Sequence, residues 1–202
     1  MNLIQRAGST IVLATALSTT AFAGLADVPS GSYELEDTHA YINFTYSHLG
    51  FSNPVVGFDE FDVALTLDTD DVTKSTLAVS VDPASIDSQV EKFDNHLKGD
   101  DMFDVAKFPT ITFEATSITS TGDSTMDITG DLTMKGITKP ITLNATINKA
   151  GTHPFSKKPT VGVSASAKLM RKDWDLGYAV PAVGNEVTLN IQVELVKAGD
   201  AS

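Results

Sequence analysis

Cysteine is absent from all 202 residues of this chain, so no disulfide can hold the fold together. Stability must come from side-chain packing and backbone hydrogen bonds, even in an oxidising compartment. Positive charge is also scarce, because 14 Lys and Arg residues stand against 26 Asp and Glu residues, for a formal net charge of −12. A surface of this sign repels phosphate backbones, so we expect no nucleic acid among the partners.

Long apolar runs are missing too, which argues against stable insertion into a membrane. A short apolar stretch, residues 11–17, cannot span a bilayer as a helix. It follows Arg6 and precedes Ala21-Phe22-Ala23, an arrangement typical of a secretory signal with its cleavage site. We therefore expect residues 1–23 to be a signal peptide cut after Ala23. Residues 24–202 would then form one domain that works in the periplasm.

Beyond this start, apolar and polar residues alternate in short segments separated by turn signals such as Asn53-Pro54 and Asp82-Pro83. Each segment is apolar on one side and polar on the other, as a half-buried strand requires. One-sided strands in this number must close on themselves or stack as two sheets. We expect an all-β fold, a single eight-stranded antiparallel barrel. The eight segments cover residues 40–48, 61–67, 77–81, 111–115, 126–132, 141–147, 161–169 and 187–195.

Residues 91–116 interrupt the alternation. The first seven can form about two helical turns, with Phe93, His96 and Leu97 on one side. A dense apolar cluster that includes Met102 and Phe103 follows, before Pro109 ends any helix. Because an apolar cluster between strands needs something to pack against, we expect a short helix that forms a lid over an open barrel end. A lidded barrel suggests a container.

The predicted inward positions include several small residues, which leave room inside the barrel: Ala115, Gly130, Ala145, Ala165 and Ala167. An empty apolar void is costly, so this room must be occupied. Either a small ligand occupies it, or large neighbouring side chains fill it; the alternation is compatible with both.

Five groups of residues follow one another in a fixed order along the chain. They are Asp37-Thr38-His39 with Ile42, Phe44, Tyr46, His48 and Gly50; Val81-Asp82-Pro83-Ala84-Ser85-Ile86-Asp87; Asp94-Asn95-His96-Leu97-Lys98 with Met102-Phe103, Lys107-Phe108-Pro109 and Ile111-Thr112-Phe113; Gly130-Asp131-Leu132-Thr133 with Gly136-Ile137-Thr138-Lys139-Pro140; and Lys172-Asp173-Trp174. In this order they resemble the YceI-like family of secreted bacterial polyisoprenoid-binding proteins, and the resemblance covers roughly residues 32–197.

The resemblance implies a lipocalin-like barrel whose pore holds a long isoprenoid chain. The partner would be an isoprenoid lipid such as ubiquinone or a polyprenyl phosphate, and no other cofactor is expected. Binding of this kind needs a dry apolar wall and no chemistry, so the chain would be a binding or carrier protein and not an enzyme. The expected ligand-binding residues are Ile42, Phe44, Tyr46, His48, Phe61, Leu65, Val79, Phe93, Leu97, Met102, Phe103, Phe113, Ala115, Ile128, Leu143, Val163, Ala165 and Trp174.

A head group would lie at one mouth of the pore. A phosphate would need cations, for which Lys168, Arg171 and Lys172 are candidates, whereas a quinone would need neutral donors such as Asn43. Many members of the family have Arg at the position that Phe93 occupies here. Its absence, together with the acidic composition, favours a neutral, quinone-like head group.

Two other classes of function compete with lipid binding. The histidines, His39, His48, His96 and His153, would serve a metal protein or enzyme, but they show no HxH or HExxH spacing, so we expect no metal site. No nucleophile-elbow pattern is present either, and we expect no catalytic residue. The other class is a ligand-free interaction module that assists a membrane redox complex. Monomer and homodimer are both compatible with the sequence.

Overall fold

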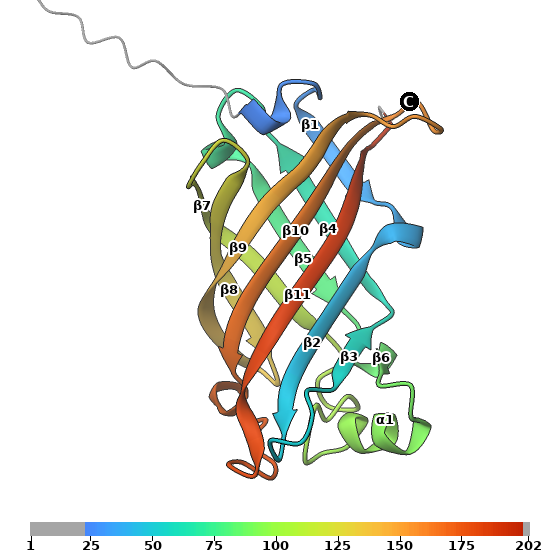
Figure 1. Cartoon of the computed structure of the whole chain (residues 1–202), viewed down its shortest axis with the longest axis vertical. Helices are drawn as coiled ribbons and strands as arrows, with labels where there is room; N and C mark the ends of the chain where they lie inside the picture. The colour runs from blue at the N-terminus through green and yellow to red at the C-terminus, as the bar shows by residue number, and fades with distance from the viewer. Residues whose placement is uncertain (1–22, 200–202) are drawn as a thin grey trace, which may run out of the picture.

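The computed structural model describes residues 23–199. The expected signal peptide, residues 1–23, therefore lies outside the described residues except for Ala23. The described chain forms one eleven-stranded antiparallel sheet and one α-helix, α1 (Glu91–Lys98) (Figure 1). The strands are β1 (Gly31–Leu35), β2 (Tyr41–His48), β3 (Val55–Phe58), β4 (Phe61–Leu67), β5 (Thr76–Val81), β6 (Ile86–Asp87), β7 (Ile111–Ser120), β8 (Thr125–Met134), β9 (Ile137–Thr152), β10 (Pro159–Met170) and β11 (Val183–Lys197).

The sheet closes because β1 pairs with β4 on one side and with β11 on the other. The ring runs β1-β4-β5-β7-β8-β9-β10-β11 and returns to β1, which confirms the expected eight-stranded antiparallel barrel. The long strand β11 pairs with two different strands along one edge. Its C-terminal end pairs with β1 through Leu195, and residues closer to its start, such as Ile191, pair with β2.

Three strands lie outside the expected set: β1, β3 and β6. Each is short, with two to five residues, and too few alternating positions to stand out in the sequence. The expected segment 40–48 corresponds to β2, which extends the sheet past the ring, and the eighth strand of the ring is β1. The count of eight was right, but one of its members was wrong.

The two ends of the barrel are closed differently. A 3-10 turn, η1 (Ala23–Leu25), and the residues after it plug one end, where Leu25 is fully buried and Val28 joins the core. The other end carries α1, as Figure 1 shows. Among residues 23–199, no helix has the length and apolar character to cross a membrane.

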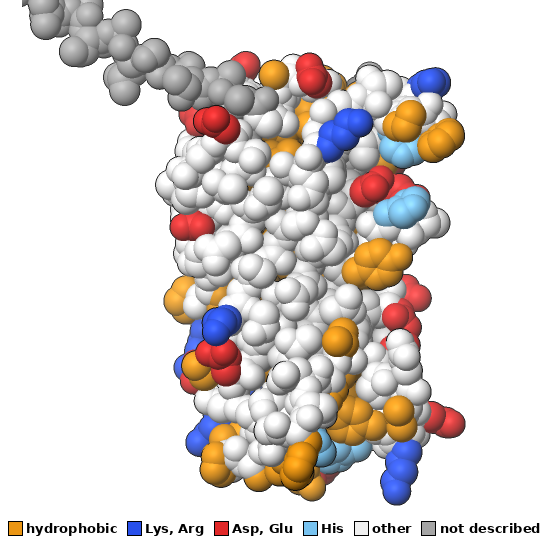
Figure 2. All heavy atoms as spheres, viewed as in Figure 1, with side chains coloured by type: hydrophobic (Ala, Val, Ile, Leu, Met, Phe, Trp, Pro, Cys, Tyr) orange, Lys and Arg blue, Asp and Glu red, His pale blue; other side chains and the backbone are white. Residues whose placement is uncertain are grey.

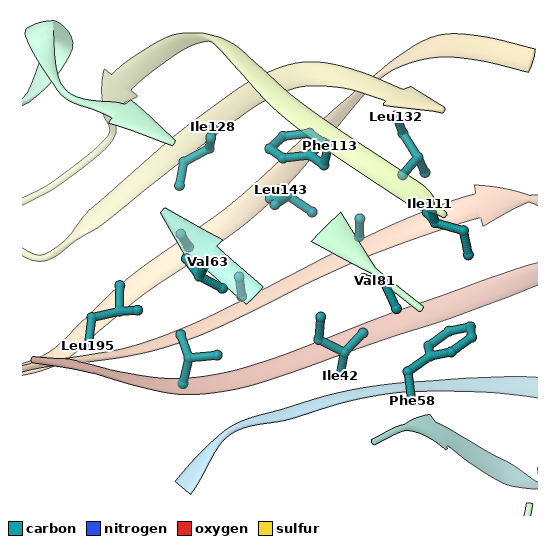
Figure 3. Packing of buried hydrophobic residues seen from close by; sticks show 14 of the residues in the cluster. Ile42, Phe58, Val63, Val81, Ile111, Phe113, Ile128, Leu132, Leu143 and Leu195 are labelled. Carbon is teal, nitrogen blue, oxygen red and sulfur yellow. The ribbon is translucent and has the colours of Figure 1, made fainter. Parts of the chain in front are cut away.

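The half of the barrel next to η1 is filled by side chains. Val63, Ile128 and Leu195 are buried there and point into the interior from three different strands (Figure 3). The small residues expected to leave room, Ala115, Gly130, Ala145, Ala165 and Ala167, do not border the open space of the barrel.

Gly130 shows how this filling works. A Cβ atom at this position would lie 2.5 Å from Cζ of Phe113 and 2.5 Å from the carbonyl oxygen of Glu114. The missing side chain is therefore what allows the Phe113 ring to lie across β8. At Gly130, a large neighbouring side chain and not a ligand therefore fills the space inside the barrel.

We predict that Gly130→Ala lowers the free energy of unfolding by about 1–3 kcal/mol, because the added methyl overpacks the barrel against Phe113 and the backbone of β7. Gly162→Ala is the matched control, since the nearest atom to its Cβ would be the carbonyl oxygen of Lys149 at 3.7 Å. That variant should stay within about 0.5 kcal/mol of the parent. Urea unfolding measures both, and equal effects of the two substitutions would contradict this account of the packing.

Candidate functional site

A cavity of about 570 Å³ occupies the half of the barrel next to α1. This volume lies within the range of about 300–1,000 Å³ that small-molecule sites occupy. Its wall is almost entirely apolar, and no Asp or Glu lines it although the chain as a whole is strongly acidic. The space therefore suits an apolar ligand and not a cation or a highly polar metabolite.

The β2 and β11 strands supply a large part of the wall. Ile42, Phe44 and Tyr46 point inward from alternating positions of β2, and Leu189 and Ile191 do the same from the neighbouring strand β11. Because side chains of a strand alternate between its faces, the residues between them point outward. Aromatic rings also meet here, with the centroids of Phe44 and Phe58 5.9 Å apart.

The α1 helix forms the lid that the sequence predicts. Its inner side carries Phe93, His96 and Leu97, all of which line the cavity, and Leu97 is buried. Phe103, in the segment after the helix, meets the ring of Phe58 on β3 edge to face at 5.7 Å. The apolar cluster between β6 and β7 therefore packs onto the open barrel end.

The start of the lid is held by Asp94. Its Oδ1 accepts hydrogen bonds from the hydroxyl of Ser88 at 2.5 Å and from the backbone N–H of Ser88 at 2.7 Å. The hydrogen bond from the Ser88 hydroxyl, and to a smaller extent the bond from the Ser88 N–H, hold the pKa of Asp94 below its ordinary value. Since Val90 at the N-cap position supplies no side-chain bond, these contacts tie the first turn of α1 to Ser88, the residue that follows β6.

The cavity reaches the surface between α1, β3 and the segment that follows η5 (Arg171–Trp174). Val55, Val90 and Tyr178 line it there and are 60%, 56% and 52% exposed. Figure 2 shows hydrophobic side chains gathered at this end of the molecule. His96 of the lid meets Tyr178 edge to face at 4.9 Å, so this contact lies at the mouth.

A buried cation borders the cavity close to its mouth. Arg171 is 8% exposed, and its guanidinium donates to the carbonyl oxygens of Gly184 at 2.8 Å, Tyr178 at 2.9 Å, Val183 at 3.1 Å and Leu176. Burial lowers its pKa. No carboxylate among the described residues pairs with it, so its charge is balanced only by backbone dipoles.

The hydroxyl of Tyr46 faces the same region. Burial raises the pKa of Tyr46, and the positive charge of Arg171 partly offsets that effect. No residue between 23 and 199 forms a hydrogen bond with this hydroxyl. Tyr46 and Arg171 therefore add hydrogen-bond donors to a largely apolar wall.

Most of the expected ligand-binding residues border the cavity. Its lining includes Ile42, Phe44, Tyr46, His48, Val79, Phe93, Leu97, Met102, Phe103, Phe113 and Leu143. Of the expected head-group residues, Arg171 lies in the lining. Whether these side chains contact a ligand remains a prediction.

The other expected residues lie elsewhere. Phe61, Leu65, Ala115, Ile128, Val163 and Ala165 face the interior but do not border the cavity. Trp174 is buried beside the barrel wall, where its Nε1–H donates to the carbonyl oxygen of Leu132 at 3.1 Å. Alternation identifies the inward face of a strand, but it does not tell how far along the barrel the interior is filled.

Three expected head-group residues also lie away from the cavity: Asn43, Lys168 and Lys172. Asn43 alternates with the inward residues of β2 and so belongs to the outer face. Lys168 pairs with Glu186 at 2.9 Å on the outside of the barrel, and Lys172 is exposed on η5. Although Lys168 and Lys172 are close to Arg171 in sequence, neither lines the cavity.

The expected ligand-binding residues include none from β11, although Leu189 and Ile191 line the cavity and belong to a segment whose alternation was recognised. Two further parts of the lining come from segments that sequence reasoning did not identify. One is β3, where Val55, Val56 and Phe58 line the cavity; the compact apolar run Val55–Phe58 was a signal that could have found it. The other is the segment after η5, which contributes Leu176 and Tyr178. That segment has no alternation, and its position depends on the hydrogen bonds of Arg171.

Comparison with known proteins gives consistent matches over this fold. The model of the YceI-like domain matches residues 33–195. Protein YceI of Escherichia coli O17:K52:H18 is 35% identical over 175 residues, which cover 87% of this chain and 91% of the relative. The crystal structure of the Campylobacter jejuni YCEI protein is 27% identical, with a TM-score of 0.68, over 76% of this chain and 90% of that one.

A third match is more distant in sequence. It is a structure described as a polyisoprenoid binding domain from Saccharophagus degradans, implicated in plant cell wall breakdown. It is 12% identical, with a TM-score of 0.63, and the match covers 84% of this chain and all of that one. At this identity the likeness establishes a shared fold.

We predict that the lid loosens in acid. Because the folded-state pKa of Asp94 is lowered, its contacts with Ser88 stabilise the lid fully above the ordinary pKa of 3.8 and are lost as the pH falls through the lower folded-state value. Hydrogen exchange of residues 88–98, corrected for the intrinsic pH dependence, should show protection falling over this window.

Asp94→Asn should expose the same amides at pH 7 and give a nearly flat pH profile. Asp101→Asn is the control, because the Asp101 carboxylate accepts no hydrogen bond from residues 23–199 and only the backbone N–H of this residue donates, to Oδ1 of Asp100. A profile for Asp94→Asn identical to that of the parent would show that the lid does not depend on this carboxylate.

Proposed function

Since the chain belongs to the YceI-like family, we propose that it is a periplasmic protein that binds or carries one long isoprenoid-type lipid without changing it chemically. The observation that carries the proposal is a lidded apolar cavity inside a closed barrel. The structural neighbour described as a polyisoprenoid binding domain supports the ligand class. The signal-like pattern of residues 1–23 supports the periplasmic location.

The cavity has the dimensions of a tail segment. Along β2 its wall extends from Ile42 to His48, about 20 Å at about 3.4 Å per residue. An extended chain advances by roughly 1.2 Å per bond, so this wall matches a segment of about four isoprene units.

Burial of the tail provides the affinity. Each buried methylene-sized group contributes about 0.8 kcal/mol, so one five-carbon unit offers about 3–4 kcal/mol. Ordering the tail and losing its translational freedom offset much of that sum. The wall needs no reactive group for this task, and a carrier without catalytic residues is the simplest account of the site.

The head group of the lipid would lie near Tyr46 and Arg171. The Arg171 guanidinium already donates four hydrogen bonds to backbone carbonyls, so few of its N–H groups remain for a bidentate pair of hydrogen bonds to a phosphate. A neutral quinone carbonyl needs one donor, which the free hydroxyl of Tyr46 can supply. We therefore favour ubiquinone-like lipids over polyprenyl phosphates.

Phe113→Asp should abolish co-purification of the lipid, because it places a carboxylate in the apolar wall. Solvent extraction and mass spectrometry of matched amounts of purified protein measure the lipid. Thr119→Asp adds the same charge on the outer face of β7 and should leave the lipid content unchanged.

A buried charge can also unfold the barrel, so a second variant is needed. Leu189→Trp keeps the wall apolar and fills part of the cavity from β11. It should retain the parent's unfolding transition and lose at least about tenfold in affinity for added ubiquinone. Full lipid content in Leu189→Trp would overturn the assignment of the cavity as the tail site.

Tyr46→Phe distinguishes the contribution of the head group to the affinity from that of the tail. Losing one hydrogen bond of about 0.5–1.5 kcal/mol should weaken ubiquinone binding by roughly two- to tenfold. The affinity for an isoprenoid hydrocarbon of the same length without a head group should not change. Fluorescence titration measures both, and an equal loss for the two ligands would place the head group elsewhere.

A further inference from the structure

Three side chains with metal-ligating atoms meet on the outer wall of the barrel, away from the cavity. Glu36 and His39 come from the connection between β1 and β2, which contains the 3-10 turn η2 (Asp37–His39), and Glu194 comes from β11. Their ligating atoms all lie within 4.8 Å of one another. The chain thus brings a residue from its C-terminal strand to two residues near the start of its described part.

The backbone already fixes part of this arrangement. The N–H of Glu36 donates to the carbonyl oxygen of Glu194 at 2.9 Å, which joins the turn to the strand. Nδ1 of His39 lies 2.6 Å from Oε2 of Glu36, and the hydroxyl of Thr38 donates to both carboxylate oxygens of Glu36 at 2.7 and 2.9 Å. The same hydroxyl lies 3.1 Å from Nδ1 of His39.

The charges of the cluster are not balanced by basic residues. Within residues 23–199, neither Glu36 nor Glu194 forms an ion pair with Lys or Arg, and the one pair in the cluster is between Glu36 and His39. Two carboxylates this close repel each other. A divalent cation with a neutral imidazole would cancel their charge.

We propose that Glu36, His39 and Glu194 form a zinc site on the outside of the barrel. One imidazole nitrogen and two carboxylate oxygens are ligands that Zn²⁺ accepts at about 2.0–2.2 Å, and water can complete a tetrahedron. Two atoms bound to one such ion can be at most about 4.4 Å apart, so small rotations of these accessible side chains would suffice. The imidazole disfavours Ca²⁺ and Mg²⁺, which prefer oxygen ligands alone.

The place of this cluster suggests a structural role for the ion. Glu194 lies where β11 changes partners from β2 to β1, and the turn that carries His39 spans the same junction. An ion held by all three residues would join the two sides of this break in the sheet. Binding that favours the folded state raises the unfolding temperature.

The test uses the purified protein without a polyhistidine tag, freed of metal with a chelator. Calorimetric titration with Zn²⁺ should reveal one ion per chain, and His39→Ala and Glu194→Gln should each weaken binding at least about tenfold. Glu186→Gln, also on β11, is the matched control and should leave binding unchanged.

Thermal unfolding gives a second readout. Zn²⁺ should raise the unfolding temperature of the parent and of Glu186→Gln, but not of His39→Ala or Glu194→Gln, while Ca²⁺ and Mg²⁺ should have no effect at equal concentration. Absence of stoichiometric Zn²⁺ binding would overturn the proposal. So would binding that survives both His39→Ala and Glu194→Gln, because the ion would then lie elsewhere.

Discussion

A closed sheet has an inside that must be filled, and this requirement governs the rest of the molecule. An eight-stranded barrel is wide enough to need either layers of side chains or a ligand. This chain meets the requirement in two ways along one axis. Next to η1, Leu25 and the inward residues of the strands fill the interior. Next to α1, the strands are lined by residues such as Ile42 and Ile191 that leave a cavity of about 570 Å³.

The elements outside the regular ring follow from this division. In the filled half, the sheet closes through the pairing of β1 with β11. The hollow half has an open end, and α1 and the residues after it cover that end. Arg171 belongs to the same arrangement. Its hydrogen bonds to the carbonyls of Leu176, Tyr178, Val183 and Gly184 shape the segment at the mouth, and they leave a positive charge beside an apolar space. The chain belongs to the YceI-like family, and a container for a lipid tail is the function that we propose for this arrangement.

Local patterns in the sequence predicted the barrel, its strand number, the lid and the inward face of most strands, because alternation and turn residues act over a few positions. They missed β1, β3 and β6, which are too short to alternate visibly. They also could not locate the cavity, since filling depends on contacts between side chains of different strands, such as that of Phe113 on β7 with Gly130 on β8. The small inward residues were therefore poor guides to open space. The same limit hid the cluster of His39 and Glu194, whose members come from opposite ends of the chain.

The central claim is that a lipid completes the interior of this barrel. Native mass spectrometry of the protein purified from its own host, without detergent, tests it most directly. We expect a species heavier than the bare chain by the mass of one isoprenoid lipid, which collisional activation releases as an intact molecule. A protein that shows only the mass of its polypeptide, both as purified and after incubation with vesicles that contain ubiquinone, would contradict the account.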